Sequence, residues 1–190
     1  MAKQIVNIGT TANDNTGDSL RVAGGKINDN FDELYAQTGW ISYEDTTHTV
    51  GSPQVVNAGV TALLTNDGVT KINIQKPMGV TEFFDVATTK LTPKNEGDFI
   101  TVDLMFLTKN TIASGVFKVY VDIPTIGIRF DQSYVCSKTA NLELGVNMSF
   151  SHYVSAAFAA NGGLIYITSI DGDTSIYNKQ FRICRIHKAR

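Results

Sequence analysis

In the stretch Ile100-Thr101-Val102-Asp103-Leu104-Met105-Phe106, every second residue is large and apolar, and Thr101 and Asp103 stand between them. Successive side chains on a β-strand point to opposite faces of its sheet. The alternation therefore predicts a strand that packs one face on a core and turns the other face toward solvent.

Similar alternating runs recur through the rest of the chain. They cover residues 69–74, 117–123, 142–150, 164–170 and 176–186. Segments rich in Asn, Asp and Gly separate them and favour turns; examples are Asn66-Asp67-Gly68, Asn161-Gly162-Gly163 and Asp171-Gly172-Asp173. Many short strands with regular turn signals predict a mainly β protein, in which residues 55–190 form a jelly-roll-like antiparallel β-sandwich.

Some of these strands carry apolar residues on both faces, as around Tyr120 and Tyr166. A second apolar face can lie in a seam between subunits, and small jelly rolls need cover for their sheet edges. We therefore expect a homotrimer, although a thick monomeric sandwich would give the same pattern.

The N-terminal region has the period of a helix instead. A stripe along one helical face consists of Leu20, Gly24, Ile27, Phe31 and Leu34, which recur at steps of three and four. The opposite face carries Lys26, Asp29, Asp32 and Glu33, which we expect in water. Asp18 is expected to cap the start of the helix and Gly39 to end it.

This helix is weak by itself. Isolated helices below about 12–15 residues are marginal, and Gly24 and Gly25 each cost about 1 kcal/mol relative to Ala. The stripe must be covered by the rest of the chain, by copies of the same helix or by another protein. The two glycines either let a second backbone come close or break the helix, and we favour an assembly element.

Short motifs follow one another in this region. They are Asn7-Ile8-Gly9-Thr10, Asn13-Asp14, Thr16-Gly17-Asp18, Leu20-Arg21, Lys26-Ile27-Asn28, Asn30-Phe31 and Glu33-Leu34-Tyr35. Over residues 5–36 the series resembles the N-terminal motif of tailed-bacteriophage tail-fibre, baseplate-associated and other appendage proteins. The resemblance implies a segment that attaches the appendage to the particle or trimerises it. The implied self-assembly or partner interface comprises Ile8, Gly9, Leu20, Arg21, Gly24, Ile27, Asn28, Asn30, Phe31, Leu34 and Tyr35.

Three segments follow from these patterns. Residues 1–40 form the attachment or trimerisation arm and helix, residues 41–54 form a polar linker, and residues 55–190 form the sandwich. Trp40 and Ile41 are apolar exceptions beside the linker and are expected to pin it to the body or to a neighbour.

The net charge, the apolar runs and the cysteines limit which classes of function are expected. A net charge of −2 gives no general attraction to nucleic acid or to an anionic membrane. No apolar run reaches the ~18–20 residues of a membrane span, and no signal peptide is evident. Cys136 and Cys184 are expected to be buried free thiols of a protein made in a host cytoplasm, although a disulfide remains an alternative.

Catalytic and metal-binding patterns are weak. Asp171-Gly172-Asp173 begins like a calcium loop but has Arg182 where the final Glu would fall, so a hairpin turn is the better interpretation. His48, His152 and His187 show no metal-ligand spacing, and no nucleophile elbow or phosphate loop occurs. We expect no enzyme activity, no cofactor and no metal site.

Two groups of residues can each be interpreted as structural or as part of a binding surface. The basic C-terminal residues are expected on a solvated strand and tail, or against an acidic neighbour in the particle; they are Lys179, Arg182, Arg185, Lys188 and Arg190. Tyrosines placed in loops could stack on sugars or pack in a core or seam; they are Tyr43, Tyr134, Tyr153 and Tyr177.

The sequence therefore predicts a non-enzymatic virion protein, a small trimeric fibre-like or spike-like appendage anchored by its N-terminal segment. Its expected partners are itself and other virion proteins of the tail, baseplate or capsid. The alternatives are a capsid decoration protein and a tail module that binds a host receptor or surface glycan.

Overall fold

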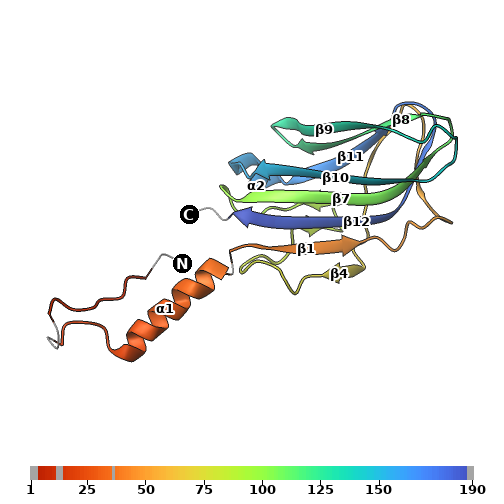
Figure 1. The fold of residues 1–190 in the computed structure, drawn as a ribbon. Coiled ribbons are helices and arrows are strands. Elements are labelled where there is room, and N and C mark those ends of the chain that lie inside the picture. The colour runs from red at the N-terminus through yellow and green to blue at the C-terminus, as the bar shows by residue number, and fades with distance from the viewer. Residues whose placement is uncertain (1–3, 12–14, 36, 188–190) are drawn as a thin grey trace.

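A computed structural model describes residues 4–11, 15–35 and 37–187, with only the backbone described for residues 32–35. Figure 1 shows two regions: helix α1 (Leu20–Tyr35) with the N-terminal arm beside it, and a two-layered β-sandwich from whose end α1 extends. No described helix is long and apolar enough to cross a membrane.

One sheet contains the longest strands. Its order is β10 (Leu144–Tyr153), β7 (Phe99–Asn110), β12 (Thr174–His187), β1 (Gly39–Glu44) and β4 (Thr70–Ile72), and β2 (Gln54–Val56) also pairs with β12. All described pairings in it are antiparallel.

The facing sheet has the order β5 (Phe84–Asp85), β6 (Lys90–Leu91), β11 (Gly163–Ser169), β8 (Val116–Ile123) and β9 (Gly127–Val135). Strand β3 (Thr61–Leu63) also pairs with β11. Four strands in the order β1-β12-β7-β10 thus face four in the order β6-β11-β8-β9, which is the arrangement of a jelly roll. The predicted mainly β, jelly-roll-like fold is confirmed.

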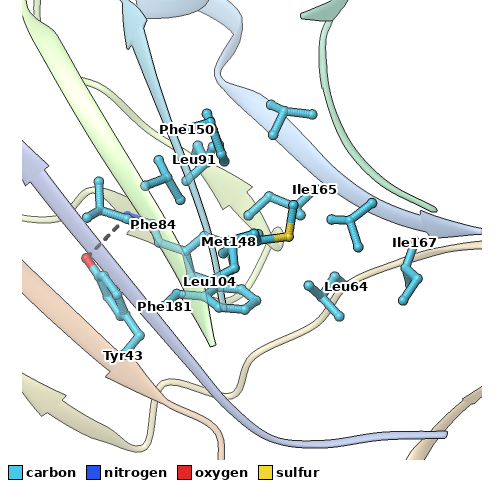
Figure 2. Close-up of a cluster of buried hydrophobic side chains, with 14 of the residues drawn as sticks. Tyr43, Leu64, Phe84, Leu91, Leu104, Met148, Phe150, Ile165, Ile167 and Phe181 are labelled. Carbon is cyan, nitrogen blue, oxygen red and sulfur yellow. Dashed lines mark hydrogen bonds between the residues drawn. The ribbon is translucent and has the colours of Figure 1, made fainter. Parts of the chain in front are cut away.

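The core lies between the two sheets (Figure 2). The alternation that predicts β7 and β8 is a real burial pattern, because Val102, Leu104 and Val119 are fully buried. At the centre, the Phe84 and Phe181 rings meet edge to face with centroids 5.4 Å apart. The Tyr43 hydroxyl accepts hydrogen bonds from the backbone of Phe83 and Phe84 at 2.9 and 3.2 Å. Each such buried side chain contributes roughly 1.5–3 kcal/mol relative to exposure.

The linker predicted for residues 41–54 is wrong at its start. Residues 41–44 belong to β1, which pairs with β12 from Gly39 to Glu44, and Ile41, Ser42 and Tyr43 are all buried. Three consecutive buried residues give no period-two signal, so the strand is hidden from pattern reading. The expectation that Ile41 is pinned to the body is confirmed.

Other differences have similar causes. Strand β9 escapes prediction because most of its side chains are exposed or half-buried, and residues 69–74 supply only the short exposed edge strand β4. A one-and-a-half-turn helix, α2 (Ala156–Asn161), occurs where none is expected; the Ser155 Oγ accepts from the Phe158 N–H at 3.3 Å and caps it. The Asp171-Gly172-Asp173 turn is not a hairpin, because β11 and β12 lie in different sheets.

The prediction of a solvated basic C-terminal strand is wrong for two residues. A β-bulge interrupts the register between Tyr177 and Gln180, and Lys179 there is buried with its Nζ 2.8 Å from the Asp45 Oδ2. Arg185 is also buried, 3.5 Å from the Asp98 carboxylate. Arg182 stays half-exposed and pairs with Asp103 at 2.7 Å. Lys188 and Arg190 lie outside the described residues.

Candidate interaction site

Helix α1 begins at a serine cap. The Ser19 Oγ accepts from the Val22 N–H at 3.4 Å, and the Ser19 carbonyl accepts from the Ala23 N–H at 2.8 Å. The expectation that Asp18 caps the helix is wrong, because its carboxylate accepts from the Lys26 Nζ at 2.7 Å and the Asn7 N–H at 2.8 Å. These hydrogen bonds, that from Lys26 first and that from Asn7 second, lower the pKa of Asp18.

The N-terminal arm runs back along the helix and is bound to it by polar contacts. The Gln4 N–H donates to the Asn30 Oδ1 and the Asn30 Nδ2 donates to the Gln4 carbonyl, both at 2.8 Å. Further along, the Lys26 Nζ donates to the Ile5 carbonyl at 3.1 Å. Lys26 is therefore not simply a solvated residue as expected; it joins the arm, the helix and Asp18.

The apolar stripe remains open to solvent beside this arm. Leu20 is 91% exposed, Ile27 45% and Phe31 51%. The arm adds Ile8, which is 89% exposed. The described part of the chain therefore leaves these four side chains largely exposed. The side chains of Leu34 and Tyr35 lie outside the described residues.

The other predicted interface residues fall into two groups. Arg21 and Asn28 are exposed, whereas Asn30 already uses its side chain to hold the arm. Gly9 is half-buried in the arm at a φ of 79°. Gly24 does not break the helix, and neither Gly24 nor Gly25 has an atom within 4 Å of the place where a Cβ would stand. The helix thus exposes backbone beside its apolar stripe.

The junction between helix and sandwich is fixed by backbone contacts. The Arg185 Nε donates to the Gln37 carbonyl at 2.7 Å, and the Trp40 N–H donates to the Gln75 carbonyl at 3.0 Å. Gly39 has a φ of 152°, and a Cβ there would lie 2.1 Å from the Gln75 oxygen. The expectation that Gly39 ends the helix is wrong, since α1 ends at Tyr35 and Gly39 begins β1.

The histidines, cysteines and tyrosines considered as possible sites in the sequence analysis are taken next. Among the described residues no group of three or more His, Cys, Asp or Glu side chains could hold a metal ion. Both cysteines are free; Cys136 is buried and Cys184 half-buried, and burial raises the pKa of each thiol. Tyr43 and Tyr177 are buried, so they cannot stack on a sugar, and Tyr134 stacks on Phe117 at 5.4 Å.

Sequence comparison finds relatives for the same N-terminal region of the chain. Residues 3–81 match the family model described as Bacteriophage T4 gp9/10-like protein, N-terminal. A 63-residue segment is 44% identical to the baseplate wedge protein gp10 of Enterobacteria phage T4, covering 33% of this chain. The N-terminal segment is a phage tail or baseplate motif. The resemblance predicted over residues 5–36 is confirmed, and the matched segment continues through β1 to β4.

The chain spans about a tenth of the length of that wedge protein, since 10% of the relative is covered. Of the twenty-one exposed large apolar side chains among the described residues, thirteen lie within the matched segment. The matched segment thus holds most of the exposed large apolar side chains of the described residues.

Structural comparison concerns the sandwich. The structure of Eiger TNF from S. frugiperda superposes with a TM-score of 0.50 at 8% identity, over 81% of this chain and 96% of that chain. The vertex protein P5 of PRD1 gives a TM-score of 0.44 at 13% identity, over 80% and 73%. The first likeness shows a shared fold and carries no information about partners.

Proposed function

We propose that this chain is a non-enzymatic structural component of a tailed-phage virion that docks through its N-terminal arm and helix. The supporting observation is the open stripe of Leu20, Ile27 and Phe31 on a helix of a phage tail or baseplate motif. Full burial of each side chain on docking would contribute roughly 1.5–3 kcal/mol. The relative's baseplate role makes the tail or baseplate the favoured location.

We further propose that the assembled form is a homotrimer, in which three copies of α1 bring their stripes together or present them jointly to a virion partner. Gly24 and Gly25 permit close approach because open space lies beside both. The residues before β1 then act as the attachment segment, and the sandwich, which begins with β1 at Gly39, projects outward. Arg21 and Asn28 are exposed polar residues placed to fix the orientation of the partners.

A matched pair of variants tests the docking role. Ile27→Asp places a charge on the stripe, and Ile112→Asp places one on the loop between β7 and β8, at nearly the same exposure of 45% and 44%. We expect Ile27→Asp alone to prevent incorporation into phage particles, with both variants folding normally. Normal incorporation of Ile27→Asp would contradict the proposal.

Light scattering of the purified chain tests the trimer separately. A threefold mass at micromolar concentration supports it, and a monomer that still enters particles shows that the stripe meets another virion protein instead. A capsid decoration role predicts that shells lacking the protein lose stability, whereas a tail or baseplate role predicts intact shells with defective tails.

A further inference from the structure

Helix α1 extends from one end of the sandwich, so its direction depends on the short connection that joins it to β1 (Figure 1). The helix has 16 residues. It therefore measures about 24 Å, and a turn of about 30° at its base would move its far end by about 12 Å. That far end carries the exposed Leu20. The direction of α1 thus decides where its apolar stripe can meet a partner.

The connection is held by the side chain of Arg185, which lies on β12. The Arg185 Nε donates a hydrogen bond to the Gln37 carbonyl oxygen at 2.7 Å. An Nη of the same guanidinium donates to the Met78 carbonyl oxygen at 3.4 Å, and the other lies 3.5 Å from the Asp98 Oδ2. Arg185 and Asp98 are both buried. One buried cation thus joins the connection, the loop between β4 and β5, and the residue before β7.

A second contact constrains the connection where it enters β1. A Cβ at Gly39 would lie 2.1 Å from the Gln75 carbonyl oxygen, so the two backbones are close together. The Trp40 N–H donates to that oxygen at 3.0 Å. Gln75 lies in the same loop as Met78, which contacts Arg185. The path of the chain is therefore fixed on both sides of residue 38.

Burial makes the contact with Gln37 costly to lose. It is the shortest of the three contacts made by the Arg185 guanidinium. A buried donor that loses its acceptor pays the desolvation penalty of an unpaired polar group, and the penalty is larger for a charged group. A change in the path of the connection would impose this penalty on Arg185. The sandwich therefore favours one direction for the start of the connection.

The two sides of this contact come from different regions of the chain. The family match over residues 3–81 includes Gln37 and Gln75, whereas Asp98 and Arg185 lie beyond it. We propose that Arg185 is a positioning residue for docking, because its buried guanidinium fixes the direction in which α1 leaves the sandwich. This inference rests on the proposed docking role of α1. It adds that the sandwich orients the docking helix as well as carrying it.

Residual dipolar couplings of the backbone amides test the proposal, since they report the direction of α1 relative to the sandwich. All samples are the full chain with Ile27→Asp, so that contact between helices does not hold α1 in place. Without a further change, couplings from both regions should fit one alignment tensor. With Arg185→Met, the couplings from α1 should shrink toward zero or depart from the tensor of the sandwich.

Lys179→Met is the matched control. It removes another buried cation of β12, whose partners Asp45 and Gln54 lie in the sandwich. Its α1 couplings should still fit the tensor of the sandwich. A single tensor in Arg185→Met, or an equal departure in Lys179→Met, would overturn the proposal.

A double variant separates positioning from stability, because Arg185→Met alone leaves the Asp98 carboxylate buried without this cation. Arg185→Met combined with Asp98→Asn removes both charges, and loss of a whole buried pair costs less than loss of one partner. The α1 couplings should still depart from the sandwich, since the Gln37 carbonyl lacks its donor. A single tensor in a folded double variant would contradict the role of Arg185.

Incorporation into phage particles distinguishes this inference from the proposed function. The double variant, with Ile27 restored, should enter particles less well than the unmodified chain. Normal incorporation despite a displaced α1 would overturn the link between helix direction and docking. Normal incorporation of Ile27→Asp would instead contradict the docking role itself, and the couplings would still decide whether Arg185 directs the helix.

Discussion

Ile183 and Ile27 are both isoleucines, but they differ in burial. Ile183 lies on the central strand β12 and is fully buried, whereas Ile27 lies on α1 and is 45% exposed. The two sheets of the sandwich cover each other and bury a continuous apolar core between them. The helix keeps an apolar stripe open, although a folded-back arm lies beside it. The difference in burial between the two regions is the observation that supports the proposed docking role of the N-terminal region.

Their ion pairs differ in the same way. Lys179 and Asp45 are both fully buried and 2.8 Å apart, and the Lys179 Nζ also contacts the Gln54 Oε1 at 2.8 Å. Lys26 and Asp18 are 2.7 Å apart but partly exposed at the surface. The Lys179–Asp45 pair thus lies inside the sandwich, whereas the Lys26–Asp18 pair of the arm lies where water and salt can weaken it.

Substitution of Lys179 and of Lys26 should give the largest difference in the free energy of unfolding between the two regions. Lys179→Met removes the buried cation that faces Asp45 and leaves its Oδ2 with only the His48 Nδ1, at 2.7 Å, as an ion-pair partner among the described residues. We expect it to lower the free energy of unfolding by about 3–5 kcal/mol. Lys26→Met breaks only a surface pair, worth about 0–1 kcal/mol. Urea unfolding of both variants measures the contrast, and equal losses would refute the assignment of Lys179 to a buried pair.

Truncation of the two isoleucines sharpens the comparison. Ile183→Ala should cost about 2–5 kcal/mol because it opens a cavity in the core. Ile27→Ala should change unfolding of the isolated subunit by less than about 0.5 kcal/mol, since it is a surface change. If Ile27→Ala proves as costly as Ile183→Ala in a monomeric sample, the stripe packs within the chain after all.

Gly24→Ala gives a smaller and more pointed effect. Open space surrounds the position, so the substitution should stabilise the helix by about 1 kcal/mol through propensity alone. We expect higher helix content by circular dichroism together with weaker self-association, because a methyl group keeps a second backbone away. Stronger self-association would show that helix stability, rather than close approach, limits assembly.

The arm should also respond to acid before the sandwich does. The folded pKa of Asp18 is lowered, so its contribution is present above the usual aspartate value of about 3.9 and is lost as pH falls through the lower folded pKa. Hydrogen exchange of the Asn7 amide, which donates to Asp18, should quicken in that range. The Ile183 amide in β12 serves as the control and should stay protected.

The sequence predicts most of the long strands because one face of each is buried. The alternation of apolar and polar residues over 100–106 and 117–123 predicts the buried face of these strands. The spacing of apolar residues by three and four from Leu20 to Phe31 predicts the stripe on the helix. The motifs over residues 5–36, which follow one another in a fixed order, indicate the resemblance to phage appendage proteins. Prediction fails where burial does not alternate, as in β1, where Ile41, Ser42 and Tyr43 are all buried.

A bulge accounts for the error at Lys179, whereas Arg185 is buried because it alternates with Phe181 and Ile183 on the inner face of β12. A single extra residue reverses the side-chain alternation beyond it. The bulge after Tyr177 allows Lys179 to enter the interior, and the bulge in β9 leaves Arg129 without a partner residue on β8. Asn178, at a φ of 52°, is a local sign of the bulge in β12, whereas the extra residue of the bulge in β9 is defined only by its partner strand.

Strand β1 completes its sheet by pairing with β12, which follows it by about 130 residues of chain. Ribosomes add roughly 5–20 residues per second, so the two strands are synthesised on the order of ten seconds apart. For much of that interval the N-terminal helix, which precedes β1, is outside the ribosome with its apolar stripe available. We therefore expect nascent chains on one messenger to meet through their helices before any sandwich has closed, which ribosome profiling of co-isolated chains can detect.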